Sequence, residues 1–90
     1  MDSKSRLRQA QNVTFQTVAG EAILIRLDTG TYFSLNKVGT EFWEMLDGSQ
    51  TVEEQAEKLA AQYGVALHMV RDDLLELAAE LLEEKLVEPI

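Results

Sequence analysis

Residues 21–48 constrain the fold more than any other stretch, and they read EAILIRLDTGTYFSLNKVGTEFWEMLDG. Ala22–Leu27 is rich in aliphatic and β-branched residues, which predicts a β-strand. The loop 28–30 is Asp-Thr-Gly, typical of a hairpin, because Asp hydrogen-bonds its own backbone and Gly accepts a positive φ. Thr31–Leu35 then predicts another strand, with no obvious onward partner in the chain. An unpaired strand edge can bind an extended peptide through its backbone.

A further strand is expected upstream of this pair. Val13–Val18 alternates, with Val13 and Phe15 on one face. Ala19-Gly20 supplies a turn before the next strand, because Gly tolerates the backbone angles that a tight hairpin requires. The sequence therefore predicts a three-stranded antiparallel meander.

The rest of the chain has the periodicity of helices. Asn36 is the predicted N-cap of a first helix, which ends at Asp47-Gly48. Thr51 begins a capping-box pattern and hence a second helix, which Gly64 terminates. A third helix is expected over about Leu67–Lys85, although no good capping residue precedes it.

Three strands followed by three helices predict an α+β domain, a meander packed on three α-helices in a winged helix-turn-helix-like shape. We assign residues 13–88 to this domain. Residues 1–12 are expected to be a flexible tail, and Pro89 is expected to mark the end of regular structure.

Charge and composition narrow the classes of partner. The chain has 90 residues, a net charge of −8 and no cysteine, so it contains no disulfide framework and no thiol nucleophile. Its acidic surface repels phosphate backbones and anionic lipid, which opposes nucleic-acid and membrane partners. No apolar run is long enough for a membrane span, and the N-terminus lacks the apolar region of a secretory signal. We expect a cytoplasmic protein.

Residues that could support catalysis are scarce. The single histidine, His68, has only Asp72 at helical spacing, so we interpret it as an exposed helix residue and expect no metal site. The many glutamates lie on the polar faces of predicted helices, where solvation explains them. No glycine-rich phosphate loop is present. The sequence therefore predicts a protein that is not an enzyme and has no cofactor.

Peptide binding is the remaining interpretation of Thr31–Leu35. Alternation places Tyr32 and Ser34 on one side of this strand and Phe33 and Leu35 on the other. One pair covers the core, and the other is free to line a groove beside the last helix. The competing explanation is a short edge that the fold simply tolerates, and the pattern alone favours neither.

The ordered set of motifs resembles the PqqD-like family, whose members are also called recognition elements of ribosomally made, post-translationally modified peptides. The matching positions begin with Asp28, Gly30, the aromatic pair Tyr32-Phe33 and Leu35-Asn36. The likeness continues with Gly39, Trp43, Leu46, Asp47-Gly48, Thr51-Val52 and Asp73-Leu74, and it covers about residues 13–88. The family's Gly near the end of the last helix is missing, because this chain has Lys85-Leu86-Val87 there.

The resemblance implies that the leader segment of a precursor peptide binds as an antiparallel strand on Thr31–Leu35, in the cleft beside the last helix. A separate modifying enzyme or leader peptidase would then act on the precursor. We expect a role in lasso-peptide or related biosynthesis, because the Tyr-Phe-x-Leu-Asn strand end resembles those members. The implied peptide-binding residues are Tyr32, Phe33, Ser34 and Leu35 on the strand and Val70, Asp73, Leu74 and Leu77 on the helix.

Three alternatives stay open from the sequence. The first is a peptide chaperone of the quinone-cofactor (PQQ) type that serves a radical-SAM enzyme. The second is an acidic winged-helix domain that acts in transcription or protein–protein interaction. The third is a homodimer formed through the edge strand or through the apolar side of the last helix. Asp73 has two interpretations of equal weight, pairing with a basic or hydroxyl group of the leader or capping a local backbone group.

Overall fold

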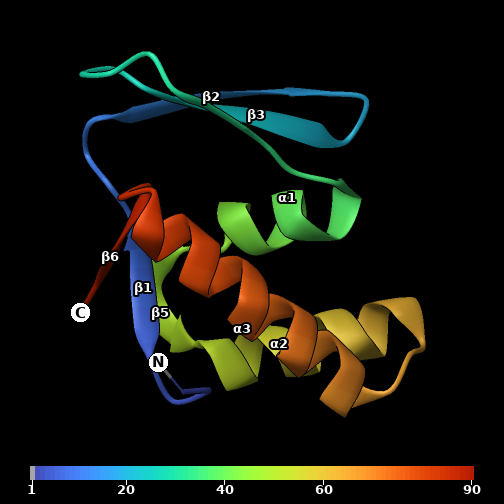
Figure 1. Cartoon of the computed structure of the whole chain (residues 1–90). Helices are drawn as coiled ribbons and strands as arrows, with labels where there is room; N and C mark the ends of the chain where they lie inside the picture. Colours follow the sequence, from blue (N-terminus) through green and yellow to red (C-terminus); the bar gives the residue numbers. More distant parts are fainter. Residues whose placement is uncertain (1) are drawn as a thin grey trace.

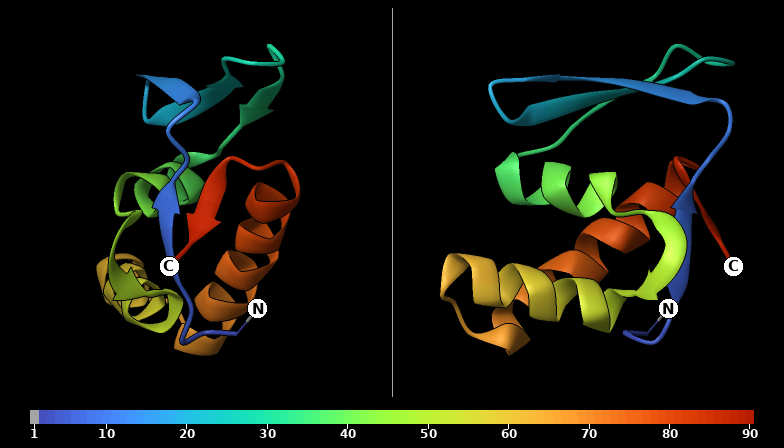
Figure 2. Two further views of the ribbon diagram at one scale, coloured as in Figure 1. Left: turned by 90° about the vertical axis from the view of Figure 1, so that its left-hand side faces the viewer. Right: turned by 180° about the vertical axis from the view of Figure 1, so that it is seen from behind.

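The computed structural model describes residues 2–90 (Figure 1). A three-stranded sheet lies above helix α1 and helix α2 lies below α1, while helix α3 runs obliquely beside both and its C-terminal end reaches the level of α1 (Figures 1 and 2). The elements are β1 (Arg6–Gln9), β2 (Val13–Val18), β3 (Glu21–Arg26), β4 (Tyr32–Ser34), α1 (Lys37–Glu44), β5 (Asp47–Thr51), α2 (Val52–Tyr63), α3 (Leu67–Glu83) and β6 (Val87–Pro89).

The predicted meander is confirmed, with strand order β2-β3-β4. β2 pairs with β3 along its whole length, from Val13 opposite Arg26 to Val18 opposite Glu21, without a bulge. The turn between them has positive φ at both Ala19 (54°) and Gly20 (81°), as a two-residue hairpin requires. β2 and β4 are therefore the two edges of this sheet, which lie on opposite sides of β3 (Figure 2).

Helix α1 supplies the centre of the core. Phe42 and Trp43 are both fully buried in the hydrophobic core. Phe15 of β2 meets the Trp43 ring edge to face, with ring centroids 5.7 Å apart. Burial of such aromatic side chains is among the largest contributions to the stability of a small domain.

The predicted caps of the first two helices are confirmed. The Asn36 side chain accepts a hydrogen bond from the N–H of Gly39, and Thr51 and Glu54 form a complete capping box. Gly64 ends α2 with a positive φ of 65°. The third helix begins at Leu67 as predicted and has no side-chain cap.

A second sheet, with order β5-β1-β6, corrects two predictions. Residues 1–12 are not simply a flexible tail, because Arg6–Gln9 is the central strand of this sheet and Leu7 is buried in the core. Helix α1 does not run to Asp47-Gly48, which begins β5. Regular structure ends at Pro89 as predicted, but in strand β6, which the sequence did not predict. Pairing with segments distant in sequence creates this sheet, and local patterns do not encode it.

The α+β class predicted from the sequence is confirmed. The second sheet closes one end of the helical layers, and the meander covers their upper side (Figure 1). Within residues 2–90, no helix combines the length and the apolar character that crossing a membrane would require.

Candidate functional site

Strand β4 exposes one of its two edges. Arg26 donates its N–H to the Thr31 carbonyl at 3.0 Å, and Leu35 donates its N–H to the Ala22 carbonyl at 2.8 Å. Antiparallel pairing alternates, so the backbone groups of Phe33 also face β3. The N–H and C=O of Tyr32 and Ser34 consequently point away from β3, and within residues 2–90 no strand pairs with them.

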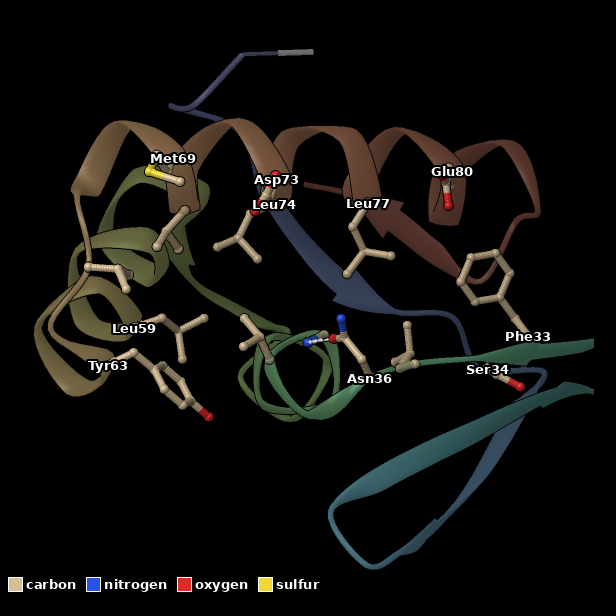
Figure 3. Close-up of a pocket in the computed structure, with 15 residues that line it drawn as sticks. Phe33, Ser34, Asn36, Leu59, Tyr63, Met69, Asp73, Leu74, Leu77 and Glu80 are labelled. Atoms are coloured by element: carbon tan, nitrogen blue, oxygen red, sulfur yellow. Dashed lines mark hydrogen bonds between the residues drawn. The ribbon is translucent and has the colours of Figure 1, made fainter.

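A cleft of about 530 Å³ opens between β4 and α3. We call it the β4–α3 cleft. In Figure 3, α3 runs along one wall from Met69 to Asp73, Leu77 and Glu80, while Phe33 and Ser34 approach from β4 and Tyr63 stands at the far end. The lining residues are Phe33, Ser34, Leu35, Asn36, Val38, Gly39, Leu59, Tyr63, Val65, Met69, Val70, Asp73, Leu74, Leu77 and Glu80.

All the site residues predicted from the sequence line this cleft except Tyr32. The Tyr32 side chain is 69% exposed and points to the outer side of the sheet, as its alternation with Phe33 requires. Leu35 and Leu74 are buried residues of the cleft lining, whereas Asp73 is exposed.

Sequence reasoning missed the end of the cleft that lies farthest from β4. Tyr63 and Met69 lie at that end (Figure 3), and Val65 also lines the cleft; Val65 and Met69 remain 49% and 58% exposed. Two exposed apolar side chains so close in sequence are a signal that could have indicated this part of the site.

Gly39 sets how closely α3 approaches α1. A Cβ atom at this position would lie 3.2 Å from Asn36 Oδ1 and 3.3 Å from Leu77 Cδ2. Any larger residue would therefore push against Leu77 and against the cap of α1. The absence of a side chain at Gly39 keeps Leu77 in place on the cleft wall.

A hydrogen bond between helices fixes Tyr63. Its hydroxyl donates to a carboxylate oxygen of Glu41, and Gln62 Nε2 donates to the other oxygen at 2.9 Å. The hydrogen bond from Tyr63 lowers the pKa of Glu41, and the same bond raises the pKa of Tyr63. Glu41 thus ties α1 to α2 and orients the tyrosine at the end of the cleft.

The cleft is apolar with an acidic rim. Asp73 and Glu80 are its charged lining residues, and both are exposed. No lysine or arginine lines it, and the whole chain has a net charge of −8. An extended segment with apolar side chains and a positive charge complements such a surface.

The described residues contain no group of three or more side chains that could hold a metal ion. His68 is exposed and does not line the cleft. What the site offers is an unpaired row of backbone donors and acceptors beside an apolar groove, an arrangement suited to binding an extended peptide.

Comparison with known families agrees with this geometry. The family model described as Coenzyme PQQ synthesis protein D (PqqD) matches residues 21–87. The chain belongs to the PqqD family. Its matched region includes β4, α1, α2 and α3, the elements that form the cleft. The resemblance noted in the sequence is thereby confirmed.

One solved structure is similar to this PqqD-family chain over nearly its whole length. It is described as TbiB1 in complex with the TbiA(beta) leader peptide, and it is 31% identical. The similarity covers 90% of this chain and 94% of that one, with a TM-score of 0.81. No curated protein matches the chain.

Proposed function

We propose that this chain binds the leader segment of a ribosomally made precursor peptide and presents it to a separate modifying enzyme or leader peptidase. The leader adds to β4 as an antiparallel strand. One observation carries the proposal, namely that the unpaired edge of β4 borders the same cleft as the apolar wall of α3. The similarity to TbiB1, whose structure contains a leader peptide, supports it.

Backbone and side chains divide the recognition. Tyr32 and Ser34 supply the outward N–H and C=O groups, and Phe33, Leu35, Val70, Leu74 and Leu77 supply apolar contacts. Asp73 pairs with a basic group of the leader, since it is exposed at the rim and the structure shows no capping bond from its side chain within residues 2–90. The protein has no catalytic role of its own in this proposal.

The partner enzyme distinguishes two forms of the proposal. Lasso-peptide biosynthesis, with a leader peptidase as partner, is favoured by the Tyr-Phe-x-Leu-Asn sequence at the end of β4. The PQQ-type alternative, with a radical-SAM enzyme, is favoured by the description of the matching family model. Co-purification of the chain with each class of enzyme, with and without leader peptide, separates the two.

Titration with a labelled leader peptide tests the proposal directly. The probes are the TbiA(beta) leader and the leaders of precursors encoded beside this chain's gene, followed by fluorescence anisotropy. We expect saturable binding with a Kd near about 1 μM, equivalent to roughly −8 kcal/mol. Absence of saturation by every probe at tens of micromolar (roughly ten times that Kd) would count against the proposal.

Amide hydrogen exchange locates the bound strand. Addition of the peptide should protect the N–H groups of Tyr32 and Ser34, which face outward, while Phe33 is already bonded to β3. The outward N–H groups of β2 serve as the internal control and should not change. Protection confined to β2 would contradict binding at β4.

A further inference from the structure

The β2 edge of the meander, which lies opposite the peptide-binding edge of β4, has no function in the proposal above. Leu27 donates its N–H to the Asn12 carbonyl at 2.8 Å, which fixes the alternation of hydrogen bonds between β2 and β3. The backbone groups of Val13, Phe15 and Thr17 therefore point away from β3. Within residues 2–90 no strand pairs with them, because β2 is the first strand in the order β2-β3-β4.

β2 lacks the features by which natural edge strands avoid pairing. Its sequence, VTFQTV, contains no charged residue, no proline and no glycine, and its pairing with β3 has no bulge. Strand β6 makes the contrast clear. Ile90 donates its N–H to the Arg6 carbonyl, so the unpaired side of β6 includes Pro89, which has no N–H to offer.

The β2 edge is also complementary to itself. Antiparallel pairing of two copies about a twofold axis at Phe15 places Val13 opposite Thr17 of the second copy and Phe15 opposite Phe15. Every outward N–H and C=O of β2 then has a partner, since the three outward residues of each strand face those of the other. Phe15 is 39% exposed, and the aromatic pair would cover part of that surface.

We infer that this chain forms a twofold dimer through antiparallel pairing of β2 with β2 of a second copy. A second copy is the occupant that the edge fits best, because all three outward residues are used and no charged pair enters the interface. Pairing of β2 with β4 of another copy fits less well, since β4 has only three residues and two that face outward. The dimer leaves both β4 edges unpaired, at the two ends of a continuous sheet.

Proline substitution at an outward position tests the interface without touching the fold. Thr17→Pro removes an unpaired N–H but leaves the bonds from Gln16 and Val18 to β3. Analytical ultracentrifugation should show a concentration-dependent dimer for the unaltered chain. The dimer Kd should rise at least about fivefold in Thr17→Pro, because the substitution is present in both copies and therefore removes two hydrogen bonds.

Ser34→Pro is the matched control, since it removes an outward N–H on β4 instead. It should weaken peptide binding and leave the dimer Kd unchanged, whereas Thr17→Pro should do the reverse. Loss of the dimer in Ser34→Pro would overturn the inference. Loss of peptide binding in Thr17→Pro would instead contradict the function proposed for β4, so the two failures are distinguishable.

Disulfide cross-linking checks the register and does not depend on the proline variants. The chain has no cysteine, so single cysteines can be introduced without background. Thr14 faces Gln16 of the second copy as a non-hydrogen-bonded pair, with Cα atoms about 4.5 Å apart, which suits a disulfide. The Cα atoms of Thr14 in the two copies, and likewise those of Gln16, are diagonal to each other and lie roughly 7–8 Å apart, which is too far for a disulfide.

A mixture of Thr14→Cys and Gln16→Cys chains should therefore form a disulfide-linked heterodimer in preference to either homodimer. Added salt should lower the dimer Kd, because each copy has a net charge of −8 and the interface is uncharged. Disulfide-linked heterodimers and homodimers in the proportions expected from random pairing would overturn the inference. So would a chain that stays monomeric up to about 1 mM, the weakest association that the measurement detects.

Discussion

The backbone N–H of Ala22 donates a hydrogen bond to the hydroxyl oxygen of Thr40, at 2.8 Å. Both residues are buried, and the carbonyl of Ala22 accepts from Leu35 at the end of β4. This bond joins β3 to α1 at the point where the chain leaves the sheet, and so it fixes where β4 ends.

Thr40→Val should therefore destabilise the fold. The substitution conserves shape but leaves the Ala22 N–H buried without a partner, which costs about 1–3 kcal/mol of the free energy of unfolding. Urea denaturation measures the change. Thr40→Ser keeps the acceptor and loses one methyl group, so it should cost no more than about 1 kcal/mol. Equal stability of the Val variant and the unaltered chain would contradict a structural role for the bond.

The hydrogen bond between Tyr63 and Glu41 predicts two pH effects. The folded state lowers the pKa of Glu41, so this stabilisation is present at neutral pH and is lost as the pH falls through that lowered pKa. The folded state raises the pKa of Tyr63, so the same bond is lost as the pH rises through the raised value. Denaturation curves at acid, neutral and alkaline pH should show both losses.

Tyr63→Phe should weaken both pH effects. Because the pKa of Tyr63 is raised, its phenolate forms at high pH, and ultraviolet titration should show that this late phenolate is absent from the variant. Tyr32→Phe is the matched control, because it should leave the late phenolate in place. A late phenolate that survives in Tyr63→Phe would contradict this assignment.

Ser34→Pro should weaken binding of the leader peptide about two- to tenfold, since it removes one of the two outward backbone donors of β4. The fold should survive, because Phe33 and Leu35 supply the bonds to β3. Ser34→Ala keeps the N–H and loses only the hydroxyl, so its affinity should stay close to that of the unaltered chain. Fluorescence anisotropy compares the three proteins, and equal loss in Ala and Pro would point to the hydroxyl instead.

Leu77→Ala should reduce peptide affinity at least about fivefold, the loss expected of an apolar residue that anchors the bound segment. Leu77 lines the cleft, whereas Leu82 on the same helix does not, and both are partly buried. Leu82→Ala should therefore lower stability to a similar extent without a comparable effect on binding. Calorimetric titration and urea denaturation of both variants separate the two effects.

The acidic rim predicts a preference for basic leaders. Asp73→Asn and Glu80→Gln should each weaken a leader with Lys or Arg by about two- to fivefold, the range for exposed ion pairs. Glu76→Gln alters an exposed acid of α3 that does not line the cleft, so it should have little effect. Each effect should shrink in high salt and should vanish with a leader whose Lys and Arg are replaced by Gln.

Local signals predicted the meander and the helices because they act over a few residues. The hairpin loop has its Gly at position 30 with φ of 73°, and the caps at Asn36 and Thr51 form the expected bonds. The β5-β1-β6 sheet could not be predicted this way. Arg6–Gln9 alternates charge with a single buried Leu7, and its partners lie about 40 and 80 residues away along the chain.

The two facing walls of the candidate site were predicted from the resemblance to the PqqD-like family, while strand alternation only divided the side chains of β4 between its two faces. The resemblance placed Phe33 and Leu77 on these walls, and both line the cleft. Tyr63 and Met69 were missed because their position depends on how α2 and α3 pack together after the turn at Gly64. That packing angle is a tertiary property, which the hydrophobic pattern of either helix alone does not determine.

The shortness of β4 limits the residence time of a bound peptide. Two residues face outward, and their backbone groups, at about 0.5–1.5 kcal/mol each, supply roughly 2–6 kcal/mol. Micromolar affinity requires about 8 kcal/mol. A segment that pairs with the strand but leaves the cleft empty therefore dissociates quickly, and residence time, more than capture rate, decides which segments a slow downstream enzyme can process.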